Sequence, residues 1–218
     1  MLYQALNILE QRGGGQPLVI IFEAEAKSEL PFYLVDYLMD HPIKDCRMIL
    51  LSVPRVSDIG CNKLTQCLIN FLDHELIKQA SFLALGDAGA VVQNLAIANI
   101  KRVRRLILVN CPTRPHLNFF EKLMNKVEKI LPLGLPFRSV GSAFDSRSFL
   151  QRVRAPALIV LSAHASTYHQ AQTKILSESM ATAWSVKLSI DREREEFGEI
   201  LEKFYGVPAK RPQKNRAA

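Results

Sequence analysis

Short apolar runs alternate along the chain with longer segments in which apolar residues recur at helical spacing. The short runs are continuously apolar, which is typical of strands covered by helices on both faces. They predict six strands, at Leu18–Phe22, Arg47–Ser52, Ser81–Leu85, Leu106–Asn110, Ala157–Leu161 and Ser185–Ser189. The longer segments predict helices near 30–40, 62–78, 88–99, 168–182 and 191–205. This order of elements predicts an α/β fold with a mostly parallel central sheet flanked by helices on both faces.

Three segments and a tail fall outside this alternation. Met1–Glu10 is amphipathic, with Leu2, Ala5, Leu6 and Leu9 on one face. Gly13-Gly14-Gly15 precedes a strand instead of following one, so it is interpreted as a loop whose glycines take positive φ and not as a dinucleotide-binding turn. Residues 111–152 form a proline-rich insertion that is predicted to be a short helical cap. One domain is therefore expected over 1–205, followed at 206–218 by a basic tail that is predicted to be disordered.

Composition and charge narrow the function classes. The chain has 218 residues, 48% of them hydrophobic, which is enough for one well-packed core. Its net charge of +7 includes four positive charges in the tail, at Lys210, Arg211, Lys214 and Arg216, which leaves only +3 for the remainder. We therefore do not expect binding to nucleic acid. No apolar run reaches the roughly 18 to 20 residues of a membrane span, and Met1–Glu10 lacks the features of a signal peptide, so a cytoplasmic protein is expected.

The cysteines and the main basic cluster do not indicate a binding site. Four cysteines form no C-x-x-C pair and no set at zinc-ligand spacing: Cys46, Cys61, Cys67 and Cys111. Buried, reduced thiols are expected, and no metal or cofactor is predicted. Four basic residues that precede a predicted strand are interpreted as solvated surface charge: Lys101, Arg102, Arg104 and Arg105. The sequence leaves the oligomeric state open.

One local motif points to a known family. Phe82-Leu-Ala-Leu-Gly-Asp-Ala-Gly-Ala90, followed by a helix and by Val103–Asn110, resembles the nucleophile elbow, helix and next strand of the α/β-hydrolases. In that elbow the nucleophile sits at strained φ and ψ after a strand, and small residues beyond it let the next helix approach. Segments 51–58, 149–156 and 195–204 resemble further parts of the family in the same order. The resemblance therefore covers nearly the whole chain and implies the α/β-hydrolase fold.

The elbow can be aligned in two ways. Placing Gly86 on the first glycine of G-x-S-x-G puts Ala88 at the nucleophile position and leaves no nucleophile. Placing Gly89 and Ala90 on the small residues that follow the nucleophile puts Asp87 there, and we favour this alignment. The resemblance then implies the branch of haloalkane dehalogenases and epoxide hydrolases, in which an aspartate attacks carbon. An aspartate just before a helix can also be an N-cap, and that structural role stays open.

The other catalytic positions of the family lack their residues. The family's acid follows the strand Ala157–Leu161, where this chain has Ser162-Ala163-His164-Ala165. The family's histidine follows the last strand, where this chain runs from Lys187 directly into the final helix. The oxyanion-hole position after the first central strand holds Phe22-Glu-Ala-Glu-Ala26, and Glu23 or Glu25 there would oppose an oxyanion unless it were protonated or turned to solvent. His164 is the strongest candidate for a relocated base, ahead of two other histidines, His116 and His169. The predicted ligand contacts are Phe22, Glu23, Ala88 and Asn110.

Three functional hypotheses follow. The leading one is an α/β-hydrolase-like protein that lacks a complete catalytic triad, has lost efficient hydrolysis and binds a small apolar ligand or a protein partner. The alternative is an active hydrolase of esters, epoxides or alkyl halides, with Asp87 as nucleophile and a base such as His164. The third is a binding module whose basic tail contacts nucleic acid or an acidic surface.

Overall fold

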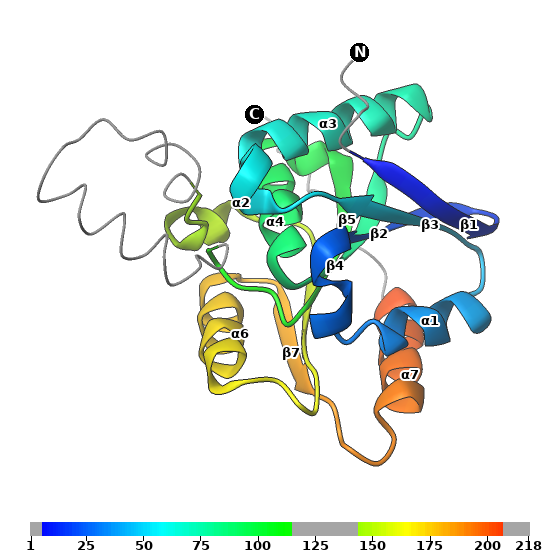
Figure 1. The fold of residues 1–218 in the computed structure, drawn as a ribbon, viewed down its shortest axis with the longest axis vertical. Helices are drawn as coiled ribbons and strands as arrows, with labels where there is room; N and C mark the ends of the chain where they lie inside the picture. The colour runs from blue at the N-terminus through cyan, green and yellow to red at the C-terminus, as the bar shows by residue number, and fades with distance from the viewer. Residues whose placement is uncertain (1–5, 115–143, 207–218) are drawn as a thin grey trace, which may run out of the picture.

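The central feature of the computed structural model, which describes residues 6–114 and 144–206, is one seven-stranded sheet (Figure 1). The order across the sheet is β1-β3-β2-β4-β5-β6-β7. β1 is antiparallel to β3, and every other neighbouring pair is parallel. The strands are β1 (Asn7–Gly13), β2 (Gln16–Glu23), β3 (Cys46–Val53), β4 (Ala80–Leu85), β5 (Val103–Val109), β6 (Ala157–Leu161) and β7 (Ala183–Lys187). The predicted mostly parallel α/β sheet is confirmed.

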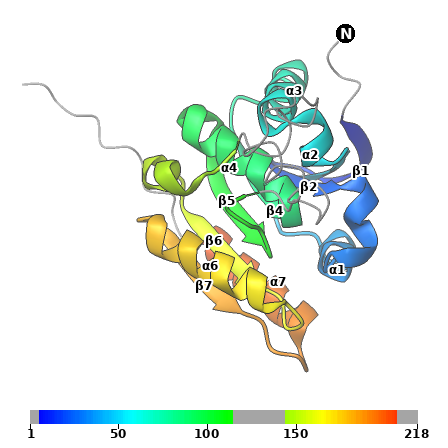
Figure 2. The same cartoon turned by 60° about the vertical axis from the view of Figure 1, so that its left-hand side comes forward.

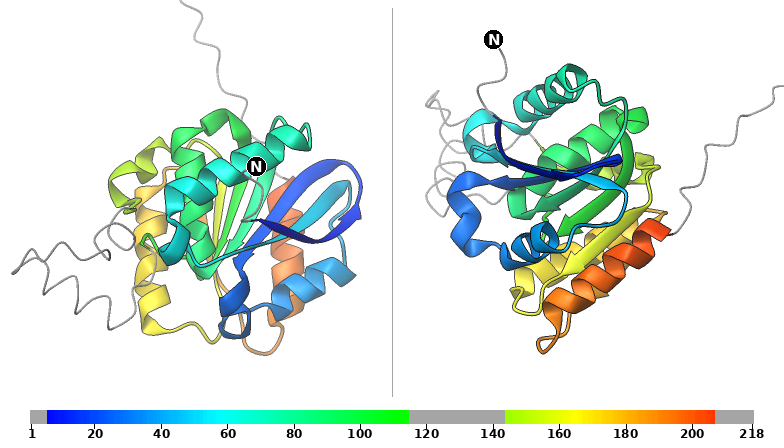
Figure 3. Two further views of the ribbon diagram at one scale, coloured as in Figure 1. Left: turned by 45° about the horizontal axis from the view of Figure 1, so that its top comes forward. Right: turned by 90° about the vertical axis from the view of Figure 1, so that its right-hand side faces the viewer.

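Helices cover both faces of the sheet (Figures 2 and 3). The α-helices are α1 (Tyr33–Asp40), α2 (Val56–Ile59), α3 (Cys61–His74), α4 (Gly89–Ala98), α6 (Thr167–Ser179) and α7 (Glu193–Gly206). The 3-10 helices are η1 (Ala24–Glu29), η2 (Gly86–Ala88), η3 (Ile100–Arg102) and η5 (Arg147–Arg152). α3, α4 and α6 pack against one face, and α1 and α7 lie together on the other. All five helices predicted from the sequence are present.

β2 shows why the strands of this sheet are continuously apolar. Leu18, Ile20 and Phe22 point into the core beneath α1 and α7. Val19 and Ile21 point into the core beneath α3 and α4. Because successive residues of a strand face opposite sides, a strand with helices on both sides needs an apolar residue at every position.

Several strands begin earlier than their apolar runs suggested, and β5 and β7 show why. β5 starts at Val103 instead of Leu106, because Val103 and Arg105 also pair with β4, at Ala80 and Ser81. β7 spans Ala183–Lys187 instead of Ser185–Ser189, and its ladder with β6 begins at the pair Ala157 and Ala183. In both cases the neighbouring strand, and not local hydrophobicity, fixes the start.

The N-terminal segment is the clearest error of the sequence interpretation. Asn7–Gly13 is an edge strand, exposed at six of its seven residues, so it lacks the apolar alternation that would have revealed it. Leu6 is buried whereas Leu9 is 52% exposed, so the expected common face of these two residues is wrong. Gly13 and Gly15 do take positive φ, at 76° and 106°. The predicted loop at the glycines is therefore confirmed, and it joins β1 to β2 across the start of β3.

Two further predictions lie outside the described residues. The cap helix was expected around 119–131, and the tail follows Gly206. The last part of the insertion is described and contains η5, whose Leu150 is fully buried in the core on the α4 side of the sheet.

Candidate functional site

A sharp bend between β4 and α4 lies at the carboxyl edge of the sheet. β4 ends at Leu85, η2 covers Gly86–Ala88, and α4 begins at Gly89. The strand-to-helix bend predicted over 82–99 is therefore confirmed. Gly86 has φ of 57°, in the left-handed region that residues with a Cβ rarely adopt. The nucleophile of an α/β-hydrolase stands at the strained residue of this bend, and in this chain that residue is a glycine.

Leu30 fills the space into which a side chain at Gly86 would project. Leu30 is half-buried and lies between η1 and α1. A Cβ added to Gly86 would lie 2.5 Å from Leu30 Cδ2. Unbonded carbon atoms rest at about 3.5 to 4.0 Å, so the two groups cannot occupy their present places together. The bend therefore presents no side chain at this position and has an apolar residue packed against it.

Asp87 lies one residue beyond the left-handed position. The favoured alignment placed Asp87 at the strained residue, whereas Gly86 has that conformation and Asp87 does not. Asp87 is not the N-cap of α4 either, since Ala88 holds that place. Its carboxylate is half-buried. Burial, and after it the charge of Asp87, raises the pKa of Cys111 and of Tyr168, so Asp87 lies near the segment after β5 and the first turn of α6.

Gly89 lets α4 approach the segment that follows β5. A Cβ added to Gly89 would lie 2.5 Å from Cys111 Sγ and 2.6 Å from Cys111 Cβ. The Cys111 thiol donates a hydrogen bond to the Ala84 carbonyl at 3.2 Å, which holds it against the end of β4. The predicted need for a small residue at position 89 is confirmed, and its cause is this close contact.

Glu23 ends β2 beside the bend and is 7% exposed. Its Oε1 accepts a hydrogen bond from the Val56 amide at 2.7 Å. Burial raises the pKa of Glu23 to about 7, against the opposing effect of that hydrogen bond, and the charge of Asp87 raises it further. Such a carboxyl group changes protonation near neutral pH and could exchange a proton with a bound molecule. When ionised, it would repel an oxyanion.

Asn110 and Ser162 join the ends of β5 and β6. Asn110 Nδ2 donates to Ser162 Oγ at 2.7 Å, and the Ser162 amide donates to Asn110 Oδ1 at 2.9 Å. Asn110 also adopts the left-handed φ of 50° that ends β5. Both polar atoms of the Asn110 side chain are therefore engaged with Ser162, at the place where the family carries its catalytic acid.

The four predicted ligand contacts come together at the carboxyl edge but are mostly interior. Phe22 is 1% exposed, Ala88 0%, Asn110 6% and Glu23 7%. The Phe22 ring packs edge-on against Phe32, with the ring centroids 4.7 Å apart. Phe22 and Ala88 thus contribute to the core, and Glu23 is the one of the four that combines a titratable group with a place beside the bend.

His164 and Glu193 occupy the regions where the family's acid and histidine would be. His164 is exposed on the loop after β6, and no hydrogen bond or ion pair joins it to another residue in the described ranges. Glu193, at the start of α7, was not anticipated: it is 7% exposed and accepts a hydrogen bond from the Ala163 amide at 2.9 Å. It also accepts from the Tyr33 hydroxyl, whose pKa is raised by burial and then by this carboxylate. Its only sequence signal was an acid in a first helical turn, which is common on helix surfaces.

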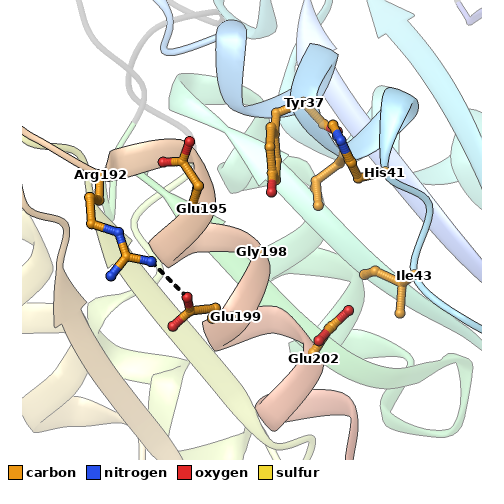
Figure 4. Close-up of a pocket in the computed structure, with 9 residues that line it drawn as sticks. Tyr37, His41, Ile43, Arg192, Glu195, Gly198, Glu199 and Glu202 are labelled. Carbon is orange, nitrogen blue, oxygen red and sulfur yellow. Dashed lines mark hydrogen bonds and ion pairs between the residues drawn. The ribbon is translucent and has the colours of Figure 1, made fainter.

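Two cavities in the described residues lie away from the bend. One, of about 300 Å³, lies between α1 and α7. Figure 4 shows Tyr37 and His41 on one side of it and Glu195, Glu199 and Arg192 on the other. The second, of about 440 Å³, lies where β2 to β5 begin and is lined by Arg47, Leu76, Lys78 and Arg104 among others.

Three further observations concern the described residues. All four cysteines are buried and none forms a disulfide, in agreement with the expected buried thiols. No cluster of three or more His, Cys, Asp or Glu side chains suited to a metal ion occurs in 6–114 or 144–206. Within the same ranges, no helix has both the length and the apolar character needed to cross a bilayer.

Comparison with known proteins identifies the architecture. The sequence matches no known family profile, and no curated protein matches it. The structure is similar to that of a hydrolase from Pseudomonas aeruginosa PA01, with a TM-score of 0.66 at 18% identity over 93% of this chain and 98% of that one. An enol-lactonase from Burkholderia xenovorans LB400 gives a TM-score of 0.65 at 17% identity over 92% and 95% of the two chains.

A third solved structure supports the same conclusion. A thermophilic esterase from Thermogutta terrifontis gives a TM-score of 0.67 at 14% identity, over 92% of this chain and 93% of that one. Identities this low carry information about the fold and not about the reaction. Together with the parallel sheet, the flanking helices and the bend at Gly86, these likenesses establish that the chain has the α/β-hydrolase fold.

Proposed function

We propose that this chain is a non-hydrolytic protein that retains the α/β-hydrolase scaffold and binds a small apolar ligand or a protein partner. The observation that carries the proposal is the pair Gly86 and Leu30. The bend residue has no side chain to act as a nucleophile, and Leu30 Cδ2 would lie 2.5 Å from any Cβ placed there. Covalent catalysis at the usual position of the fold therefore lacks its nucleophilic group, and Leu30 occupies the space into which that group would project.

The acid and histidine regions support the same proposal. Ser162 is engaged with Asn110 through two hydrogen bonds. Glu193 is engaged with the Ala163 amide at 2.9 Å and with the Tyr33 hydroxyl. A triad needs an imidazole oriented by a carboxylate and placed against the nucleophile. The side chains in these two regions instead link β5 to β6 and the loop after β6 to α7.

We place the binding function at the carboxyl edge of the sheet, where open α/β folds bind ligands. Leu30, Asp87 and Tyr168 are half-buried at this edge, so they combine an apolar contact, a charge and a hydroxyl. The two acidic groups, Glu23 and Asp87, favour a ligand with a hydrogen-bond donor and disfavour an anionic one. The four buried unpaired thiols support the predicted cytoplasmic location, since reduced cysteines are typical of that compartment.

A hydrolysis assay tests the proposal. Wild type and Asp87→Asn are compared on short p-nitrophenyl esters and on an epoxide, with Asp58→Asn as a control, because Asp58 is an exposed carboxylate near the same edge. We expect all three proteins to give the rate of the buffer alone. Turnover by wild type and Asp58→Asn that disappears in Asp87→Asn would refute the proposal.

The alternative is a hydrolase in which Asp87 attacks and His164 acts as the base. One observation favours it: burial, and after it the charge of Asp87, raises the pKa of Tyr168, so Asp87 lies near the first turn of the helix that follows the His164 loop. This mechanism requires that Asp87→Asn and His164→Ala each abolish turnover. An activity that survives His164→Ala would exclude this base.

A further inference from the structure

The edge at which the parallel strands begin is strongly basic. The loops that lead into β2 to β7, counted with η3 and the first three residues of each strand, hold eight basic residues and two acidic ones. The basic residues are Lys44, Arg47, Lys78, Lys101, Arg102, Arg104, Arg105 and Arg154, and the acidic ones are Asp45 and Glu75. We call this surface the basic edge. It is opposite the bend, so its role is independent of the function proposed above.

Leu76 projects from the basic edge with no cover from the described residues. It is 87% exposed, the most exposed large apolar residue in the described ranges. Its φ is 54°, where glycine is usual at the end of a helix. The turn is nevertheless fixed, because the Leu76 amide donates to Asp73 O at 3.1 Å and the Ile77 amide donates to Leu72 O at 2.7 Å. A bulky apolar side chain is thus held outward in a strained conformation, and the described residues cover little of it.

A second apolar side chain lies on the adjoining loop. Ile100, in η3, is 41% exposed. The ion pair between Arg102 Nη2 and Asp73 Oδ1, 2.6 Å long, ties the η3 segment to the end of α3 that carries Leu76. Two exposed apolar residues therefore stand on neighbouring loops of the basic edge.

Two acids near this surface, Glu75 and Asp73, are paired with arginines, whereas several cations have no ion pair in the described residues. Glu75 pairs with Arg47 at 2.8 Å and Asp73 pairs with Arg102. Lys78, Lys101 and Arg104 form no ion pair with any residue in 6–114 or 144–206, and Arg104 Nε has no hydrogen-bond partner there. Lys78 and Arg104 line the cavity of about 440 Å³ beside Leu76. The uncompensated positive charge thus surrounds the exposed leucine.

We propose that the basic edge docks on a membrane surface that contains anionic lipid. Leu76 and Ile100 would enter the boundary between headgroups and acyl chains, while the three unpaired cations face lipid phosphates and carboxylates. A nucleic acid or a soluble anion would satisfy the cations but leave the leucine in water, so the combination favours a bilayer. The chain also leaves α7 at this edge, because Arg105 donates to Tyr205 O at 3.1 Å. The sequence that follows Gly206 contains four further basic residues, Lys210, Arg211, Lys214 and Arg216.

Vesicle sedimentation with the full chain tests this inference. We expect binding to phosphatidylcholine vesicles that contain phosphatidylserine, little binding to phosphatidylcholine alone, and a loss of binding at high salt. Leu76→Gly should weaken the association by about tenfold. Glycine is at ease at positive φ, so this variant should fold at least as well as wild type, and its thermal midpoint serves as the check. Lys78→Gln and Lys101→Gln should each weaken vesicle binding by about fivefold.

Ile190→Gly is the matched control, because Ile190 is 68% exposed but lies in the loop after β7, at the opposite edge. We expect it to bind vesicles as wild type does. Equal binding by Leu76→Gly and wild type would overturn the proposal. So would binding that depends only on the four basic residues of the tail. Wild type that ignores vesicles but binds a DNA duplex or inorganic phosphate through Lys78 and Lys101 would also overturn it.

Discussion

Replacing Glu23 by glutamine should stabilise the protein at neutral and alkaline pH. The side chain is 7% exposed, and its pKa is raised from 4.5 to about 7, chiefly by burial. Glutamine keeps the oxygen that accepts the Val56 amide, a hydrogen bond of 2.7 Å in the wild type, but it carries no charge. The substitution therefore removes the cost of ionising a buried carboxyl group and leaves the local geometry in place.

The magnitude follows from linkage between protonation and folding. Each pKa unit corresponds to about 1.4 kcal/mol, so a rise from 4.5 to about 7 corresponds to about 3 kcal/mol. The folded protein binds the proton of the Glu23 carboxyl group more tightly than the unfolded chain does. The stability that this protonation contributes is therefore fully present below pH 4.5 and is lost as the pH rises to about 7. Glu23→Gln should then match wild type near pH 4.5 and exceed it above pH 7 by up to this amount.

Thermal unfolding at a series of pH values measures this difference. For a chain of 218 residues, about 3 kcal/mol corresponds to a shift of roughly 6 to 12 °C in the thermal midpoint. Glu25→Gln is the control, since the Glu25 side chain is 55% exposed and pairs with Arg55 on the surface, where such pairs contribute little. If the midpoints of Glu23→Gln and wild type differ equally at all pH values, or not at all, the buried carboxyl does not ionise as argued.

The remaining predictions concern the glycines of the bend. Gly86→Ala should lower the free energy of unfolding by about 2 to 3 kcal/mol in urea titrations, because of left-handed strain and overpacking. Adding Leu30→Ala to this variant should restore part of the loss. If the effects of the two substitutions were strictly additive, the two side chains would not compete for the same space. Gly89→Ala should cost about 1 to 3 kcal/mol, because its Cβ would meet Cys111 Sγ at 2.5 Å. Gly14→Ala, which would meet nothing within 4 Å, should be nearly neutral, and an equal loss in both variants would refute the packing argument.

The sheet could be predicted because its central strands are buried on both sides. Burial on two faces demands continuous apolar runs, and β2, β3, β4 and β6 have them. β1 has six exposed residues out of seven and is held by pairing with β3. No local pattern records such a partnership, and for the same reason the sequence misplaced the start of β7.

The candidate site was only partly predictable. The bend itself followed from small residues at a strand end, and Gly89 is needed where the sequence placed it. Whether Gly86 or Asp87 is the strained residue of the bend depends on backbone φ. The sequence does not show which of two adjacent residues in a turn has positive φ. The roles of Leu30, Ser162 and Glu193 depend on their contacts with other parts of the chain. Their partners are Gly86, Asn110 and Ala163, respectively, and each pair is between 30 and 56 residues apart in the sequence.

By itself the sequence determined the class of fold, the order of its elements and the absence of a histidine between the last strand and the final helix. These are properties of local composition, because hydrophobic period and residue identity are already present in the unfolded chain. The tertiary structure decided which residue of the bend is strained, that Leu30 occupies the space before it, and that Leu76 stands exposed among unpaired cations. Those facts depend on distances between segments remote in sequence, and such distances exist only after the chain has packed.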